Sequence, residues 1–218
     1  MGSDLWMHQT PWHDDPASAL RELQARLFAE QYEPFDPARE LQEDLIDAKN
    51  AQRDAQAEGD PYGLADHYGH VAETYEELSK EPMPTDVASK IRLLQKIWAA
   101  QGEEIGGILD VTGVQPAPPS GSQPVEQEPM EQETAQPWMR LGNEAFFHGM
   151  DERIAFSLGE IDLLRLVGAA KPSLKQAEES AGNIQGELGR GDCICFPIYD
   201  ESPARKPLGW YFIGCTLD

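Results

Sequence analysis

Two histidines and a glutamate stand at a spacing that can bring metal ligands together. His67, His70 and Glu73 follow one another at intervals of three residues, and side chains three or four positions apart lie on one face of a helix. Imidazole nitrogens and carboxylate oxygens are ligands of Zn²⁺ and other divalent cations. One hypothesis for the function is therefore a metal-dependent enzyme or ligand-binding domain that uses His67 and His70. Because the sequence identifies no further ligand, the other interpretation is that these side chains border an apolar helix stripe and that the chain has no cofactor.

All three cysteines lie near the C-terminus. Cys193 and Cys195 are two residues apart and point to one face of a strand, and a hairpin can bring Cys215 to face them. Three thiolates can hold a soft metal. The CxxC spacing of structural zinc sites is missing, however, and free cysteines in apolar strands mostly act as small buried hydrophobic groups. We interpret these residues as part of a core.

Aromatic residues beside carboxylates are the candidates for contact with another protein. Interfaces gain most of their energy from a few aromatic anchors surrounded by a charged rim. Two groups have this composition: Trp12 with Asp14 and Asp15, and Tyr62 with Asp60 and Asp66. These six residues are the predicted binding residues.

The charge of the chain limits the partners it can have. The 218 residues include 39 acidic and 17 basic side chains, a net charge of −22. Nucleic acid is excluded as a ligand because phosphate binding needs a surplus of Lys and Arg. A protein with a basic surface is the expected partner, although a high net charge can also serve only to keep a protein in solution.

The sequence also lacks several features that would place or identify the protein. It has no run of about 18 apolar residues and no apolar signal segment. With an odd number of cysteines, this predicts a cytoplasmic protein with reduced thiols and no membrane partner. No GxSxG, P-loop, kinase or deaminase motif is present, which favours a protein that is not an enzyme.

The N-terminal half has the pattern of a helical layer. Asp-Pro pairs at residues 15–16, 36–37 and 60–61 place a capping carboxylate before a proline, an arrangement that favours a helix start. Apolar residues then recur every three or four positions, which predicts helices over 16–31, 37–58 and 61–80 and a fourth that begins at Asp86. Together these form a layer of about four helices over residues 15–102.

The C-terminal part has the pattern of a small sheet with helices. Residues 192–217 contain two apolar runs joined by a charged loop, which predicts a hairpin. Residues 106–114 predict a turn followed by a short strand, and 153–157 predict another strand. A capping box of Ser157 and Glu160 predicts a helix over 158–167, and a second apolar stripe predicts one over 172–188. The fold class is therefore α+β, with a small, mainly antiparallel sheet built on the hairpin.

Composition divides the chain into three regions. Residues 1–114 form a mostly helical acidic region, 115–137 a Pro- and Glu-rich disordered linker or long loop, and 138–218 a small α+β module. Residues 5–10 are predicted to form a strand. Two arrangements are open: either this strand joins the sheet of the hairpin and the halves form one domain, or the C-terminal module is separate.

The hypothesis that fits these observations best is a non-catalytic, acidic protein-protein interaction module. Its most concrete version is an inhibitor or immunity-type protein that masks the basic surface of a partner such as a toxin, with carboxylates where phosphates would lie. Besides the metal-dependent alternative, an adaptor or scaffold subunit of a larger complex stays open.

Overall fold

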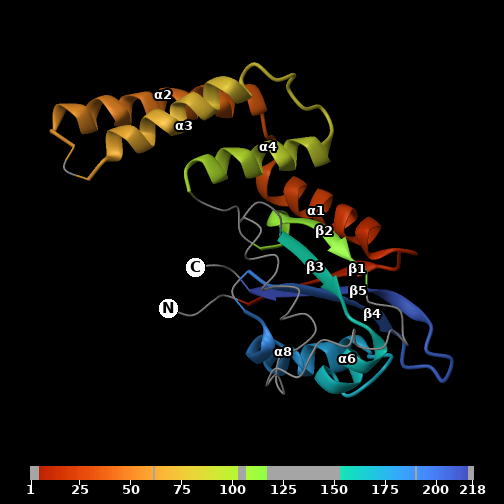
Figure 1. Ribbon diagram of the computed structural model, residues 1–218. Helices are drawn as coiled ribbons and strands as arrows, with labels where there is room; N and C mark the ends of the chain where they lie inside the picture. The colour runs from red at the N-terminus through yellow and green to blue at the C-terminus, as the bar shows by residue number, and fades with distance from the viewer. Residues whose placement is uncertain (1–4, 61, 103–106, 117–152, 190, 216–218) are drawn as a thin grey trace, which may run out of the picture. The chain divides into compact units, whose positions relative to one another are not determined.

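The chain has an α+β fold, as the sequence predicted (Figure 1). The computed structural model describes residues 5–60, 62–102, 107–116, 153–189 and 191–215. Two compact units form, one from residues 1–23 with 106–218 and the other from residues 24–105. The predicted linker lies outside the described residues from position 117 onward. The elements are, in order, β1 (Leu5–Pro11), α1 (Pro16–Tyr32), α2 (Pro37–Ala57), α3 (Leu64–Leu78), α4 (Val87–Ala100), η1 (Gly107–Asp110), β2 (Val111–Gln115), β3 (Arg153–Ser157), α6 (Glu160–Leu166), α7 (Leu174–Glu179), α8 (Ala181–Glu187), β4 (Cys193–Tyr199) and β5 (Pro207–Cys215).

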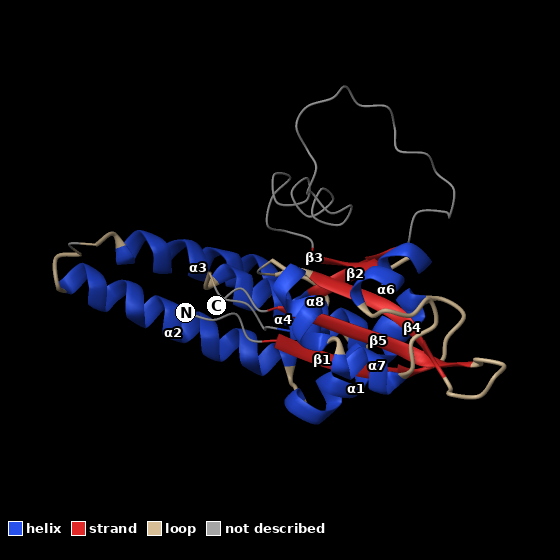
Figure 2. Cartoon of the chain, turned by 90° about the horizontal axis from the view of Figure 1, so that it is seen from below, coloured by secondary structure: helices blue, strands red, loops and turns tan. Residues whose placement is uncertain are grey.

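The sheet is mixed. Its strand order is β1-β5-β4-β3-β2, and Figure 2 shows the strands side by side. The pairs β1–β5 and β5–β4 are antiparallel, whereas β4–β3 and β3–β2 are parallel. The two antiparallel pairs agree with the sheet predicted from the sequence, whereas the two parallel pairs make it mixed and were not predicted. The parallel direction of β3 and β4 follows from their connection, because a crossover through α6, α7 and α8 carries the chain from the end of β3 back to the end of the sheet where β3 begins.

The N-terminal strand is an edge of this sheet. Strand β1 pairs with β5 from Leu5 opposite Cys215 to Pro11 opposite Gly209. Gly209 permits this approach, because a Cβ atom there would lie 2.0 Å from the carbonyl oxygen of Thr10. Residues 5–11 and the C-terminal hairpin thus belong to one sheet, although almost 200 residues separate them in the sequence.

The helices α6, α7 and α8 cover one face of the sheet (Figure 1). Between them and the sheet lies a core of buried residues: Leu158, Leu163, Leu166, Val167, Ala177, Ala181, Ile184, Ile194, Phe196, Ile198, Tyr211 and Ile213. The register places Cys193 and Cys195 on the other face, where Cys195 lies opposite Phe212. Cys193 lies opposite Gly214, so Cys215 points to the helix-covered face. Cys215 therefore does not face the other two cysteines, so the three-thiolate arrangement that the sequence allowed does not form.

The second unit contains a long helical hairpin, α2 and α3, followed by α4 (Figure 1). Its core is Leu41, Ala48, Val71, Ala72, Tyr75, Leu78, Leu93 and Ile97, all buried. They include part of the apolar pattern of α2 (Leu41 and Ala48) and of α3 (Val71, Tyr75 and Leu78). The hydroxyl of Tyr75 donates a hydrogen bond of 3.1 Å to the carbonyl oxygen of Ile97, one of the last four carbonyls of α4, which lack partners within an α-helix.

Two of the three Asp-Pro pairs open a helix directly. Asp36 accepts hydrogen bonds from the backbone of Ala38 and Arg39, and α1 begins at Pro16 after Asp15. Helix α3 begins at Leu64, three residues later than predicted. Before the helix, the N–H group of Gly63 donates to the carbonyl oxygen of Asp60 at 3.5 Å, and Gly63 has a φ of 71°, a value that favours glycine. The Asp60 carboxylate still accepts from the N–H group of Leu64 at 2.6 Å.

Two predictions about the C-terminal helices are wrong. Ser157 does not cap a helix, because it ends β3 and pairs with Cys195, and α6 starts at Glu160 after Gly159. The capping box lies instead at Ser173 and Gln176. The single helix predicted over 172–188 is two short helices that meet at Ser180, and Ala177, Ala181 and Ile184 stay buried across this junction.

Candidate functional site

The candidate metal ligands lie on the exposed side of α3. His67, His70 and Glu73 are all exposed to solvent. In the described part of the chain, no group of three or more His, Cys, Asp or Glu side chains is arranged to hold a metal ion. Among these described residues, no further ligand therefore joins the two histidines. The His67 ring contacts that of Tyr68, with 5.4 Å between the ring centroids.

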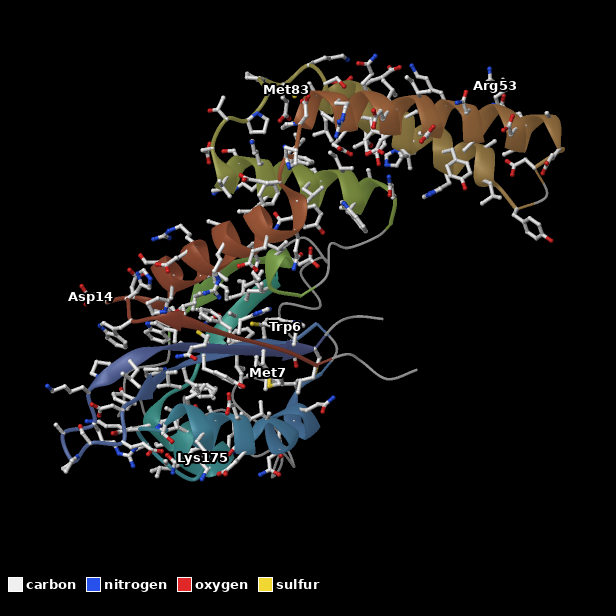
Figure 3. The ribbon with its side chains drawn as sticks, turned by 180° about the vertical axis from the view of Figure 1, so that it is seen from behind. Trp6, Met7, Asp14, Arg53, Met83 and Lys175 are labelled. Carbon is white, nitrogen blue, oxygen red and sulfur yellow. The ribbon has the colours of Figure 1, made fainter. Side chains whose placement is uncertain are left out.

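The predicted group around Trp12 is largely occupied by contacts within its own unit. The Trp12 ring stacks on Trp210 with 5.7 Å between centroids and 9° between planes. The Trp210 indole N–H donates to the carbonyl oxygen of His13 at 2.9 Å. Asp15 accepts from the N–H and the hydroxyl of Ser18, and these two bonds lower the pKa of Asp15. These contacts hold β1 and the start of α1 in place, and Asp14 is exposed (Figure 3).

The predicted group around Tyr62 lies at the turn of the α2–α3 hairpin. Tyr62 is 85% exposed, the largest exposure among the described large hydrophobic residues that reach the surface, and Leu64 is 43% exposed. Asp66 is exposed, whereas Asp60 is engaged by the start of α3. This turn thus presents an aromatic ring and carboxylates without burying them, as a contact with another protein requires.

The hairpin carries a large surplus of carboxylates. Residues 36–81 contain 13 acidic and 4 basic side chains. The bases are engaged within the hairpin. Arg39 lies 3.1 Å from Glu40, Lys49 pairs with Glu76 at 2.5 Å, and Lys80 lies 2.6 Å from Glu77. Arg53 donates a hydrogen bond to Asn50 and lies on the outside of the hairpin (Figure 3). Among the described residues no ion pair joins a base to Asp44, Asp47, Asp54 or Glu58.

A groove of about 330 Å³ lies on the hairpin, beside the end of α4. It is lined by Asp44, Asp47, Ala48, Ala51, His67, Tyr68, Val71, Tyr75 and Gln101. Partial burial raises the pKa of Asp44, and the neighbouring carboxylates of Glu40, Asp47 and Glu43 raise it further. This side of the groove is therefore electronegative and has no cation of its own within the described residues.

Sequence reasoning missed Asp44 and Asp47. The signal for them was present, because acidic residues at positions 40, 43, 44 and 47 have the spacing of one helical face. Of the predicted residues, His67 lies in the same groove. Tyr62 and Asp66 lie at the turn of the same hairpin. One predicted metal ligand, His67, and two predicted binding residues therefore belong to the α2–α3 hairpin.

The buried cysteines are unsuited to nucleophilic chemistry. All three are buried and form no disulfide. Burial raises the pKa of Cys195 to about 12 and that of Cys193 well above its ordinary value. Because the thiolate is the nucleophile and the metal-binding form, these residues act as core side chains.

Comparison of the chain with protein-family models, curated proteins and solved structures gave no match. Among the described helices, none has the length and apolar character needed to cross a membrane.

Proposed function

We propose that this chain is a non-catalytic acidic protein that binds another protein through the α2–α3 hairpin, and that the partner presents a basic surface. The most concrete form of this proposal is an inhibitor or immunity-type protein that masks the basic site of its partner. The observation that carries it is the set of carboxylates on the hairpin that no base of the described residues neutralises, beside the exposed ring of Tyr62.

Each of these features has a distinct part in binding. Uncompensated carboxylates create a negative potential that attracts a basic partner and raises the association rate. Tyr62 supplies the apolar area that a charged surface lacks, and aromatic residues of this kind are frequent among the side chains that dominate binding energy. Both lie on one helical hairpin, and groups that are already placed before binding lose less entropy when a partner binds.

The proposal is tested by affinity capture with the full chain as bait in an extract of its native host at low salt. Three baits are compared: the natural sequence, a hairpin variant with Asp54→Asn, Glu58→Gln and Asp66→Asn, and a control with Glu160→Gln, Glu178→Gln and Glu201→Gln. The two variants lose the same charge, and all six carboxylates belong to exposed or half-buried residues. Captured proteins are identified by mass spectrometry and eluted with rising salt.

We expect a basic protein that the natural and control baits retain, that the hairpin variant loses, and that elutes as salt rises, since screening weakens surface electrostatics. The proposal is wrong if the bait retains no protein, if retention does not depend on salt, or if both variants lose the partner equally.

A further inference from the structure

We propose that the groove between α2 and α3 receives an arginine side chain, whose guanidinium group binds the carboxylates of Asp44 and Asp47. The inference rests on the proposed function and names the chemical group of the partner that the hairpin recognises. The groove lies wholly within the second unit, at residues of α2, α3 and the end of α4.

The walls of the groove match the two ends of an arginine side chain. Ala48, Ala51 and Val71 form an apolar part that can cover a chain of methylene groups. The carboxylates of Asp44 and Asp47 lie on the same side, one turn apart on α2. An aliphatic stem that ends in a cation satisfies both parts of the groove, whereas a purely apolar or an acidic group satisfies at most one.

Charge complementarity is the second argument. Asp44 is half-buried; this burial is the main cause that raises its pKa, and the nearby carboxylates of Glu40, Asp47 and Glu43 raise it further. No base of the described residues pairs with Asp44 or Asp47. The carboxylates of the folded chain therefore repel one another, and a cation that binds between them relieves this repulsion. Only a positively charged ligand gains binding energy in this way.

Arginine fits better than lysine for two reasons. A planar guanidinium can donate two parallel hydrogen bonds to a carboxylate, whereas an ammonium acts as a point charge. The rings of Tyr68 and His67 also line the groove, and guanidinium groups stack on aromatic rings.

A peptide titration followed by NMR tests the inference without a known partner. The probe is the capped tripeptide Lys-Arg-Lys, and its control is Lys-citrulline-Lys, in which a neutral group of nearly the same shape replaces the guanidinium. The readout is the set of ring signals of His67 and Tyr68. We expect saturable shifts with the arginine peptide and binding at least about tenfold weaker with the citrulline peptide, a loss of about 1.4 kcal/mol.

A matched pair of variants separates the groove from general attraction. Asp44→Asn with Asp47→Asn removes two carboxylates inside the groove, and Asp54→Asn with Glu58→Gln removes two outside it. Asp54 lies seven residues after Asp47, about 10 Å along α2 at 1.5 Å per residue, which is about one Debye length at 0.1 M salt. The first variant should weaken peptide binding about tenfold or more and the second less than about twofold. The dispersion of the remaining signals shows whether each variant is folded. Should the first variant unfold, Ala51→Leu, which fills the groove without changing charge, replaces it with the same expected loss.

Three results overturn the inference: equal binding of the two peptides, equal weakening by the two variants, or shifts that spare His67 and Tyr68. Each leaves the proposed function untouched, because capture of a basic partner does not depend on the groove. Conversely, groove binding of arginine with no partner in the capture experiment contradicts the proposed function alone.

Discussion

Replacement of Gly209 by alanine is the sharpest test of the pairing between the two ends of the chain. Gly209 lies on β5 opposite Pro11 of β1. A Cβ atom at this position would lie 2.0 Å from the carbonyl oxygen of Thr10 and 3.1 Å from its carbonyl carbon. Both atoms belong to the backbone, so no rotation of a side chain can relieve the contact.

The size of the effect follows from the distance. Ordinary contacts of a Cβ atom begin at 3.4 Å, so the Thr10 carbonyl would have to move by about 1.4 Å (3.4 minus 2.0). Such a shift strains the β1–β5 ladder, and overpacking of this kind costs about 1–3 kcal/mol. Because no flexible group absorbs the strain, we expect about 2–3 kcal/mol. At roughly 2–4 °C per kcal/mol for a chain of this length, the melting temperature should fall by roughly 4–12 °C.

Thermal unfolding followed by tryptophan fluorescence measures this change, since Trp210 lies next to Gly209 and contacts Trp12. Gly113→Ala is the matched control, because a Cβ atom at this strand position meets nothing within 4 Å. We expect the control to melt within about 2 °C of the natural protein. If the two variants melt together, β1 does not lie against Gly209 and the described pairing is wrong.

Three further predictions concern the core and the acidic hairpin. Iodoacetamide near pH 8 should leave Cys193, Cys195 and Cys215 unmodified in the folded protein and modify all three in denaturant, because burial keeps Cys195 protonated with a pKa of about 12; modification of the folded chain would show that this core is open. Tyr75→Phe should lower the free energy of unfolding by about 1 kcal/mol in denaturant titration, because the carbonyl of Ile97 loses its bond from the Tyr75 hydroxyl; an unchanged midpoint would contradict that bond. Asp44→Asn should raise the melting temperature at pH 7. The folded-state pKa of Asp44 lies above the ordinary value of 3.8, so the folded chain binds more protons and stability falls as pH rises from that value through the raised pKa. The gain should therefore shrink as pH drops below 3.8, and a gain that is independent of pH would refute this reason.

Local signals in the sequence predicted much of the fold. Asp15 and Asp36 each precede a helix. The middle parts of the apolar stripes of α2, α3 and α4, such as Leu41, Val71 and Ile91, are buried as expected, whereas Leu64 at the start of α3 is exposed. The C-terminal hairpin was also predictable, because its two strands are close in sequence and apolar on both faces. In these elements the structure favoured by neighbouring residues is also the one favoured by packing in the folded chain, so a local sequence pattern is enough to predict them.

Features that depend on distant partners were not predictable in this way. The face on which Cys215 lies depends on the register of the hairpin, and a shift of one residue moves a side chain to the other face. The pairing of β4 with β5 shifts between Ile198 and Tyr199, close to the loop that joins the two strands, and no pattern in the sequence indicated this shift. Likewise, Ser157 has the spacing of a capping box with Glu160, but its pairing with Cys195 keeps it in a strand. Tertiary contacts decided both cases.

The candidate site was predictable only in part. Tyr62 and Asp66 could be selected because an aromatic residue near carboxylates is a local pattern, and the structure leaves both exposed. The groove could not be found from the sequence, since Asp44 and His67 approach it from different helices. Only the packing of α3 along α2 shows that the acidic face of α2 borders a concave surface.

The central claim, that the acidic hairpin binds a basic protein, is tested most directly by the affinity of the purified partner for the two charge-matched variants. Isothermal titration at about 50 mM and about 300 mM salt compares them under weak and strong screening. Our account predicts that the hairpin variant binds at least about tenfold more weakly than the variant altered at Glu160, Glu178 and Glu201, and that this difference shrinks at the higher salt. Equal affinities of the two variants at both salt concentrations would contradict it.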